Sequence, residues 1–335
     1  MKKHLLFVLV ALTILLYACG ENQPKQQELS CSPANSEIAI FNHGKLSFYN
    51  PQDRCMYYVD NETDSVLTGS YHSDGKFYYC TAVNGLVFLK SIDLSLENPV
   101  PVQLADWNLE LNDCITETYG EISFLDFFPE QGVFGFWHGF SWDGMDFNEC
   151  KLYDPKTGTV TDWNHDQVLN SYFSVEEDES HQMAPKFNYD DFTQIGDDYY
   201  YKDVCLTDQM DVMSWSHNPD YVTGPEYWGY DVDPSETMVN FFASIEQGDF
   251  EHGPICVASL DGKFQKYFEG TDFCRSGSAW LSDGSLVFGG KQPRTQDDPD
   301  DDDYWDNSKH CVWIMYPNRQ TAVLSLGSFT MKYSK

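Results

Sequence analysis

Basic residues are scarce in this sequence, which contains 20 lysines and arginines against 53 aspartates and glutamates and has a formal net charge of −33 at pH 7. A surface this acidic repels the phosphates of nucleic acids and anionic lipid headgroups alike. We therefore expect no nucleic-acid partner and no direct adsorption of the protein body to a membrane.

Motifs that hold metals or perform catalysis are also missing. The chain has no His-Glu-x-x-His motif and no Cys-x-x-Cys spacing, so we expect no metal and no cofactor. The acidic run 295–308 lacks the glycine and the final glutamate of an EF-hand loop, and we interpret it as a solvated insertion. Catalytic residues stay unknown, and the sequence leans against an enzyme without excluding one.

Long stretches with the 3.6-residue period of an amphipathic helix are absent as well. Aromatic residues make up 16% of the chain, and glycine, asparagine, aspartate and serine recur at short intervals. This composition favours an all-β fold.

Two kinds of hairpin recur along the chain. In the first, an alternating strand, a turn and a second strand follow one another, at 45–59, 89–104, 150–163, 256–268 and 311–326. The second has a short strand, an Asp-Gly turn and an apolar strand, at 71–83 and 279–290, with looser versions at 124–137 and 192–204. Joined in order, the two hairpins make four-stranded meanders, which are the blades of a β-propeller.

The expected fold is therefore a β-propeller of six four-stranded blades, with five or seven blades left open and a β-sandwich as the alternative. Predicted blades occupy 67–107, 121–163, 190–240, 241–270 and 278–326, and three further strands lie in 37–60. A blade spacing of about 40 to 50 residues fits this repeat. The segment 328–334 is expected to complete the first blade and so join the two ends of the chain.

The first residues have the pattern of an export signal. Two lysines precede the apolar run Leu5–Leu16, which is too short to span a bilayer as a helix. Leu16, Tyr17, Ala18 and Cys19, followed by Gly20, resemble the lipobox of bacterial lipoproteins, although Tyr17 is bulkier than the residue commonly found at that place. The resemblance implies that residues 1–18 are removed and that Cys19 carries the lipid.

Three regions follow from this interpretation: a signal peptide at 1–18, a flexible tether at 19–36 and a propeller-like domain at 37–335. As a whole, the chain resembles the lipid-anchored propeller proteins of Gram-negative bacteria. That resemblance implies a cell-envelope protein attached through its lipid, most simply to the outer membrane, with its body in the periplasm or at the cell surface.

Residues buried by the fold can also be predicted. Cys150, Cys256 and Cys311 begin the same hairpin position in different blades, so we expect them to be small buried hydrophobic side chains. His138, among aromatic residues, is expected to be packed or hydrogen-bonded and not a ligand to a metal.

The stretch 213–234 is the candidate binding region. It is rich in tryptophan, tyrosine and carboxylates, two of its prolines would interrupt a central strand, and we interpret it as a loop. Either its aromatic side chains cap the core or they contact a ligand, and we select Trp215, Tyr227, Trp228 and Asp231 as ligand-binding candidates. The predicted function is a binding module for a protein or glycan partner, and the alternative is a carbohydrate-active hydrolase or lyase with carboxylates at the central channel.

Overall fold

The computed structural model describes residues 31–110, 121–128, 131–141, 145–163, 189–216, 222–246, 253–271, 277–291 and 310–332. Residues Ser32 to Lys335 belong to one compact unit. The predicted signal peptide, Cys19, most of the predicted tether and the acidic run 295–308 lie outside the described residues. Among those described, no helix is both long and apolar enough to span a bilayer.

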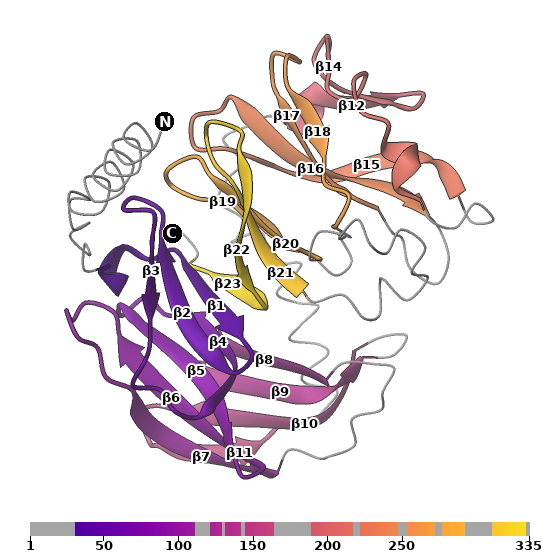
Figure 1. The fold of residues 1–335 in the computed structure, drawn as a ribbon. Coiled ribbons are helices and arrows are strands. Elements are labelled where there is room, and N and C mark those ends of the chain that lie inside the picture. The colour runs from indigo at the N-terminus through magenta and orange to yellow at the C-terminus, as the bar shows by residue number, and fades with distance from the viewer. Residues whose placement is uncertain are drawn as a thin grey trace, which may run out of the picture. The chain divides into compact units, whose positions relative to one another are not determined.

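Six antiparallel sheets follow one another along the chain (Figure 1). Sheet I contains β1 (Ile38–Asn42), β2 (Lys45–Asn50), β3 (Cys55–Tyr58) and the last strand, β23 (Ser328–Met331). Sheet II contains β4 (Ser65–Tyr71), β5 (Lys76–Val83), β6 (Leu86–Asp93) and β7 (Val102–Glu110). Sheet III contains β8 (Glu121–Phe128), β9 (Val133–Ser141), β10 (Met145–Asp154) and β11 (Thr159–Asp162).

The second half of the chain repeats the plan. Sheet IV contains β12 (Phe192–Ile195), β13 (Asp198–Tyr201) and β14 (Val204–Cys205). Sheet V contains β15 (Val222–Val232), β16 (Met238–Glu246), β17 (Ile255–Ser259) and β18 (Gln265–Tyr267). Sheet VI contains β19 (Ser278–Trp280), β20 (Leu286–Lys291), β21 (His310–Met315) and β22 (Thr321–Leu326). The short 3₁₀ helices are η1 (Pro33–Asn35), η2 (Tyr189–Asp191) and η3 (Val212–Trp215).

Consecutive meanders of this kind make the fold a β-propeller, as the sequence predicts. In each of sheets II to VI, spatial order equals chain order, so every connection within a sheet is a hairpin. In sheet I, β23 takes the place at the edge that the first strand takes in the other sheets. These first strands of neighbouring sheets contact one another, β23 with β4, β4 with β8 and β15 with β19. These first strands occupy the inner position of their blades.

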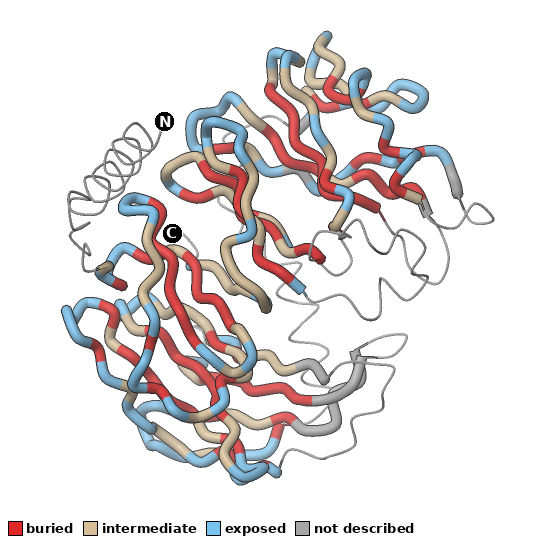
Figure 2. The backbone as a smooth tube through the Cα atoms, viewed as in Figure 1, coloured by how far each residue is buried: buried red, intermediate tan, exposed pale blue. Residues whose placement is uncertain are grey.

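The core lies between successive sheets because their strands bury both faces. In β1, Ile38 and Ile40 belong to a cluster shared with sheet VI, whereas Ala39 and Phe41 belong to one shared with sheet II. Similar clusters join sheets II and III, IV and V, and V and VI. In Figure 2 the buried positions run along the strands, and the turns at their ends are exposed.

Closure of the first blade by the C-terminal segment is confirmed. β23 pairs antiparallel with β1, with Ile40 opposite Phe329. The backbone N–H of Lys332 donates to the carbonyl of Glu37 at 2.8 Å. The Glu37 carboxylate in turn accepts from the backbone N–H of Ser282 at 2.9 Å and from the Ser282 hydroxyl, which fastens sheet VI to the same corner.

The predicted boundary between the fourth and fifth blades is wrong. Sheet IV spans only 192–205 and has three strands among the described residues, and sheet V spans 222–267. The expectation of a loop through 213–234 is also wrong, because β15 occupies half of it. Pro225 is tolerated there because it lies on the first strand of its sheet, within a register shift between Val222 and Glu226.

Ordered structure begins before the predicted domain start at residue 37. The Ser32 side chain accepts a hydrogen bond from Ala34 N and caps η1, and Ser36 is buried. Cys31 and Cys55 are disulfide-bonded.

The residues expected to be buried are buried. Cys150, Cys256 and Cys311 all lie in the interior, and desolvation raises the pKa of Cys256. His138 stacks on Phe136 and shares a 2.8 Å hydrogen bond between its Nδ1 and the hydroxyl of Ser123.

Gly327, at the turn into β23, tests the closure. Its φ is +100°, and an added Cβ would lie 1.8 Å from the carbonyl oxygen of Phe41. We expect Gly327→Ala to lower the free energy of unfolding by at least about 2 kcal/mol in urea or thermal denaturation. Gly277→Ala, whose Cβ would meet nothing within 4 Å, is the matched control. Equal stability of the two variants would contradict the closure.

Candidate functional site

A shallow, open depression lies where sheets IV and V meet. It has a volume of about 470 Å³ and is lined by Gln194 of β12 and by Glu226, Tyr227 and Trp228 of β15. Two of the four predicted ligand residues, Tyr227 and Trp228, therefore line one surface feature. Gln194 comes from a separate segment, and nothing in the sequence links it to β15.

The Gln194 side chain fastens β12 to β15. Its Nε2 donates to the carbonyl of Pro225 at 2.6 Å and to that of Gly196 at 3.0 Å. Its Oε1 accepts from the backbone N–H of Tyr227 at 3.1 Å. Because both ends of the amide are engaged, Gln194 shapes the depression and positions its neighbours.

Tyr227 forms the floor of the depression. It is 9% exposed, stacks on Tyr199 at 5.3 Å between ring centroids, and donates its hydroxyl hydrogen to the carbonyl of Asp197. Burial raises the pKa of its phenol well above the ordinary value. Tyr227 is therefore a neutral, packed side chain that holds the neighbouring residues of the depression in place.

The expectation that Trp215 is accessible is wrong. Its side chain is 4% exposed, and its indole N–H donates to the carbonyl of Thr271 at 2.9 Å. It belongs to the apolar cluster between sheets IV and V, so for this residue the aromatic ring does cap the core.

Trp228 behaves in the opposite way. It is 41% exposed, and its ring meets Phe242 edge-on with centroids 6.3 Å apart. One side of the indole is thus held by the sheet while part of it faces solvent. A half-held, half-exposed aromatic ring is well suited to stacking against a ligand.

Two carboxylates flank Trp228 on the same strand. Glu226 and Asp231 are both exposed residues of β15. Asp231 as a whole is exposed, but nearby residues of the fold partly desolvate its carboxyl group and raise the pKa of that group. Its Oδ1 accepts a hydrogen bond from the backbone N–H of Val232. Glu226 lies inside the stretch selected from the sequence, but it was not among the selected residues.

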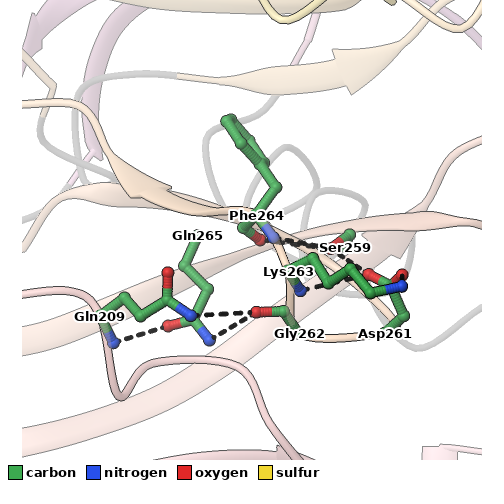
Figure 3. Close-up of polar contacts among 7 residues, drawn as sticks. All are labelled: Gln209, Ser259, Asp261, Gly262, Lys263, Phe264 and Gln265. Carbon is green, nitrogen blue, oxygen red and sulfur yellow. Dashed lines mark hydrogen bonds and ion pairs between the residues drawn. The ribbon is translucent and has the colours of Figure 1, made fainter.

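Sheets IV and V are also joined away from the depression (Figure 3). Beyond β14, the backbone N–H of Gln209 donates to Oε1 of Gln265 at 2.8 Å. The Nε2 atoms of Gln209 and Gln265 both donate to the carbonyl of Gly262, at 3.3 and 3.2 Å, in the turn between β17 and β18. Side-chain hydrogen bonds therefore join sheet IV to sheet V at two separate places, which fixes the position of β12 against β15.

Within the described ranges, no group of three or more histidine, cysteine, aspartate or glutamate side chains could hold a metal ion. The depression instead offers an aromatic surface and carboxylate acceptors.

No family model matches the chain, and no curated protein matches it. Solved structures similar to it include TolB from Acinetobacter baumannii, at 13% identity and a TM-score of 0.26, covering 89% of this chain and 54% of that one. The chain thus spans about half of TolB. A second is the β-propeller domain of the Trilobed protease from Pyrococcus furiosus, at 12% identity and a TM-score of 0.26, covering 87% of this chain and 79% of that one.

A third similar structure is the catalytic domain of the GH62 α-L-arabinofuranosidase from Coprinopsis cinerea, at 9% identity and a TM-score of 0.24, covering 88% of this chain and 75% of that one. Likenesses this weak carry no argument about function. Assignment of the fold rests on the strand order of the sheets.

The contrast between the two tryptophans can be measured by acrylamide quenching of fluorescence in the full chain. We expect Trp228→Phe to remove a readily quenched component, because Trp228 is 41% exposed, and Trp215→Phe to leave it in place, because Trp215 is 4% exposed. The reverse pattern would mean that Trp228 belongs to the core and that the depression is not a contact surface.

Proposed function

We propose that this protein is an exported, lipid-anchored binding module that contacts a protein or glycan partner through the depression on β15. The observation that carries the proposal is the half-exposed Trp228 between the carboxylates of Glu226 and Asp231. Tryptophan is a favoured anchor at binding surfaces, and carboxylates accept hydrogen bonds from hydroxyl, amine and guanidinium groups.

The scaffold beneath these residues supports recognition. Gln194 and Tyr227 are fully engaged with the backbone of sheets IV and V, so the exposed side chains sit on a preorganised base. Preorganisation lowers the entropy that binding must overcome.

The alternative of a glycoside hydrolase is less well supported at this site. Glu226 and Asp231 oppose Ser244 and Asn240, which are four residues apart on β16. At about 3.3 Å per residue, the backbone positions of the two residues are roughly 13 Å apart. Glycosidases place their two carboxyl groups about 5 to 9.5 Å apart, so a pair at this backbone spacing is poorly suited to that chemistry.

Export is supported by the covalent state of two cysteines. Cys31 and Cys55 are disulfide-bonded, and disulfides persist in oxidising compartments such as the bacterial periplasm. Together with the signal-like start of the chain, this favours a location in the cell envelope, with the lipid on Cys19 as the membrane attachment.

Lipid attachment predicts that a fatty-acid analogue fed to expressing bacteria labels the protein. The label should be lost in Cys19→Ala, because in the bacterial lipoproteins that this sequence resembles the cysteine thiol is the atom to which the lipid is attached. Equal labelling of both proteins would refute the anchor.

The binding proposal predicts that the fluorescently labelled full-length protein binds features on oligosaccharide or peptide arrays in a Trp228-dependent manner. Trp228→Ala should lose the signal. Tyr58→Ala, which removes a 63% exposed aromatic residue of β3 in sheet I, should keep it. A complete absence of features that depend on Trp228 would overturn the proposed function.

A further inference from the structure

A break in strand register places the three exposed residues of β15 on one face. Glu226 pairs with Ser244 and Trp228 with Phe242, so these two residues share a face by the two-residue period of a strand. The next pair is Asp231 with Asn240, so three steps on β15 match two steps on β16. This bulge returns Asp231 to the face of Trp228, whereas regular alternation would have put it on the other side.

Gly229 makes the bulge. Its φ is +67°, in the left-handed region that favours glycine, and an added Cβ would lie 2.5 Å from the ring of Phe242. Glu226, Trp228 and Asp231 therefore form a continuous row, which we name the acidic-aromatic strip.

An independent observation beside the strip points to a hydrogen-bond donor. Asn240, the cross-strand neighbour of Asp231, is 2% exposed. Its Nδ2 donates to the hydroxyl of Ser278 on β19 at 3.0 Å, whereas its Oδ1 is buried without a partner. A buried acceptor without a donor is costly, and this one belongs to the residue directly opposite Asp231 in the sheet.

The charge of the protein around the strip indicates that a ligand bound there would be a cation. None of the residues that line the depression is basic, and the chain carries a formal net charge of −33. A field of this sign attracts cations and raises their rate of encounter.

We propose that the acidic-aromatic strip binds arginine side chains of an extended peptide segment of a partner protein. This inference rests on the proposed binding function and specifies its ligand class. A guanidinium group presents five N–H donors in a planar fork, stacks on indole rings and pairs with carboxylates. Lysine offers the same charge without the planar fork and is expected to bind more weakly.

The geometry also sets the spacing of the arginines. Glu226 and Asp231 are separated by four strand steps, or roughly 13 Å. Two arginines four residues apart in an extended peptide span the same length, so each can meet one carboxylate while the segment between them crosses Trp228.

The test uses isothermal titration calorimetry of the full-length protein at low ionic strength. The probe is the blocked peptide acetyl-Gly-Arg-Gly-Gly-Gly-Arg-Gly-amide, and its matched control carries citrulline, the neutral isostere, at both arginine positions. We expect binding of the arginine peptide and binding of the citrulline peptide weaker by about tenfold or more. Equal affinity for the two peptides would overturn the inference, because charge would then contribute nothing.

Variants locate the site. Glu226→Gln, Asp231→Asn and Trp228→Ala are each expected to weaken binding of the arginine peptide about two- to fivefold, which is the usual worth of one exposed ion pair or cation–π contact. Glu97→Gln removes one exposed carboxylate from the connection between β6 and β7 and should leave the affinity unchanged. If it weakens binding as much as Glu226→Gln, the peptide is held by the overall charge and the strip is not its site.

A parallel titration with the neutral oligosaccharide maltohexaose separates this inference from the proposed function. Trp228-dependent binding of maltohexaose without binding of the arginine peptide would keep the binding module and overturn its cationic ligand. Binding of the arginine peptide, lost in the strip variants, is the result that supports the inference.

Discussion

Pairing of β1 with β23 is the interaction on which the whole fold depends. Ile38 and Ile40 of β1 pack towards sheet VI, and Ala39 and Phe41 pack towards sheet II, so a first sheet without its inner strand would leave the clusters on either side of β1 incomplete. Glu37 strengthens the junction, because its carbonyl and carboxylate receive bonds from the C-terminal segment and from sheet VI. The two ends of the chain thus stabilise each other across the full length of the sequence.

Within that regular scaffold, the candidate site arises from an irregularity. Bulges are common where a strand must redirect a side chain, and the one at Gly229 moves Asp231 to the face of Trp228. The same strand contains Pro225, which a central strand would not accept. Local rules of strand formation are broken at the proposed contact surface, and Gln194 compensates by supplying hydrogen bonds to the backbone around Pro225.

Much of the fold could be predicted from the sequence because hairpin signals are local. The plan of paired hairpins and the closing strand at 328–334 both follow from alternation and turn residues, as the Asp283 side chain shows by accepting two bonds from Ser285. The predicted boundary between sheets IV and V is wrong because Pro225 and Gly229, which normally mark turns, interrupt the strand pattern of β15 in the sequence. Trp215 and Trp228 could not be distinguished, since burial depends on neighbours such as Thr271 and Phe242, and Gln194 reaches the site only through folding.

The central claim is that a cation on the acidic-aromatic strip contacts Asp231, and its ionisation reports this most directly. Desolvation raises the pKa of Asp231 in the free protein. A bound guanidinium favours the ionised carboxylate, so it should lower this pKa, and affinity should fall as pH drops through it. Carbon-13 NMR titration of the Asp231 carboxyl, with the arginine peptide and with its citrulline counterpart, measures the effect. Our account predicts a lower pKa with the arginine peptide only; an identical pKa with both peptides would contradict it.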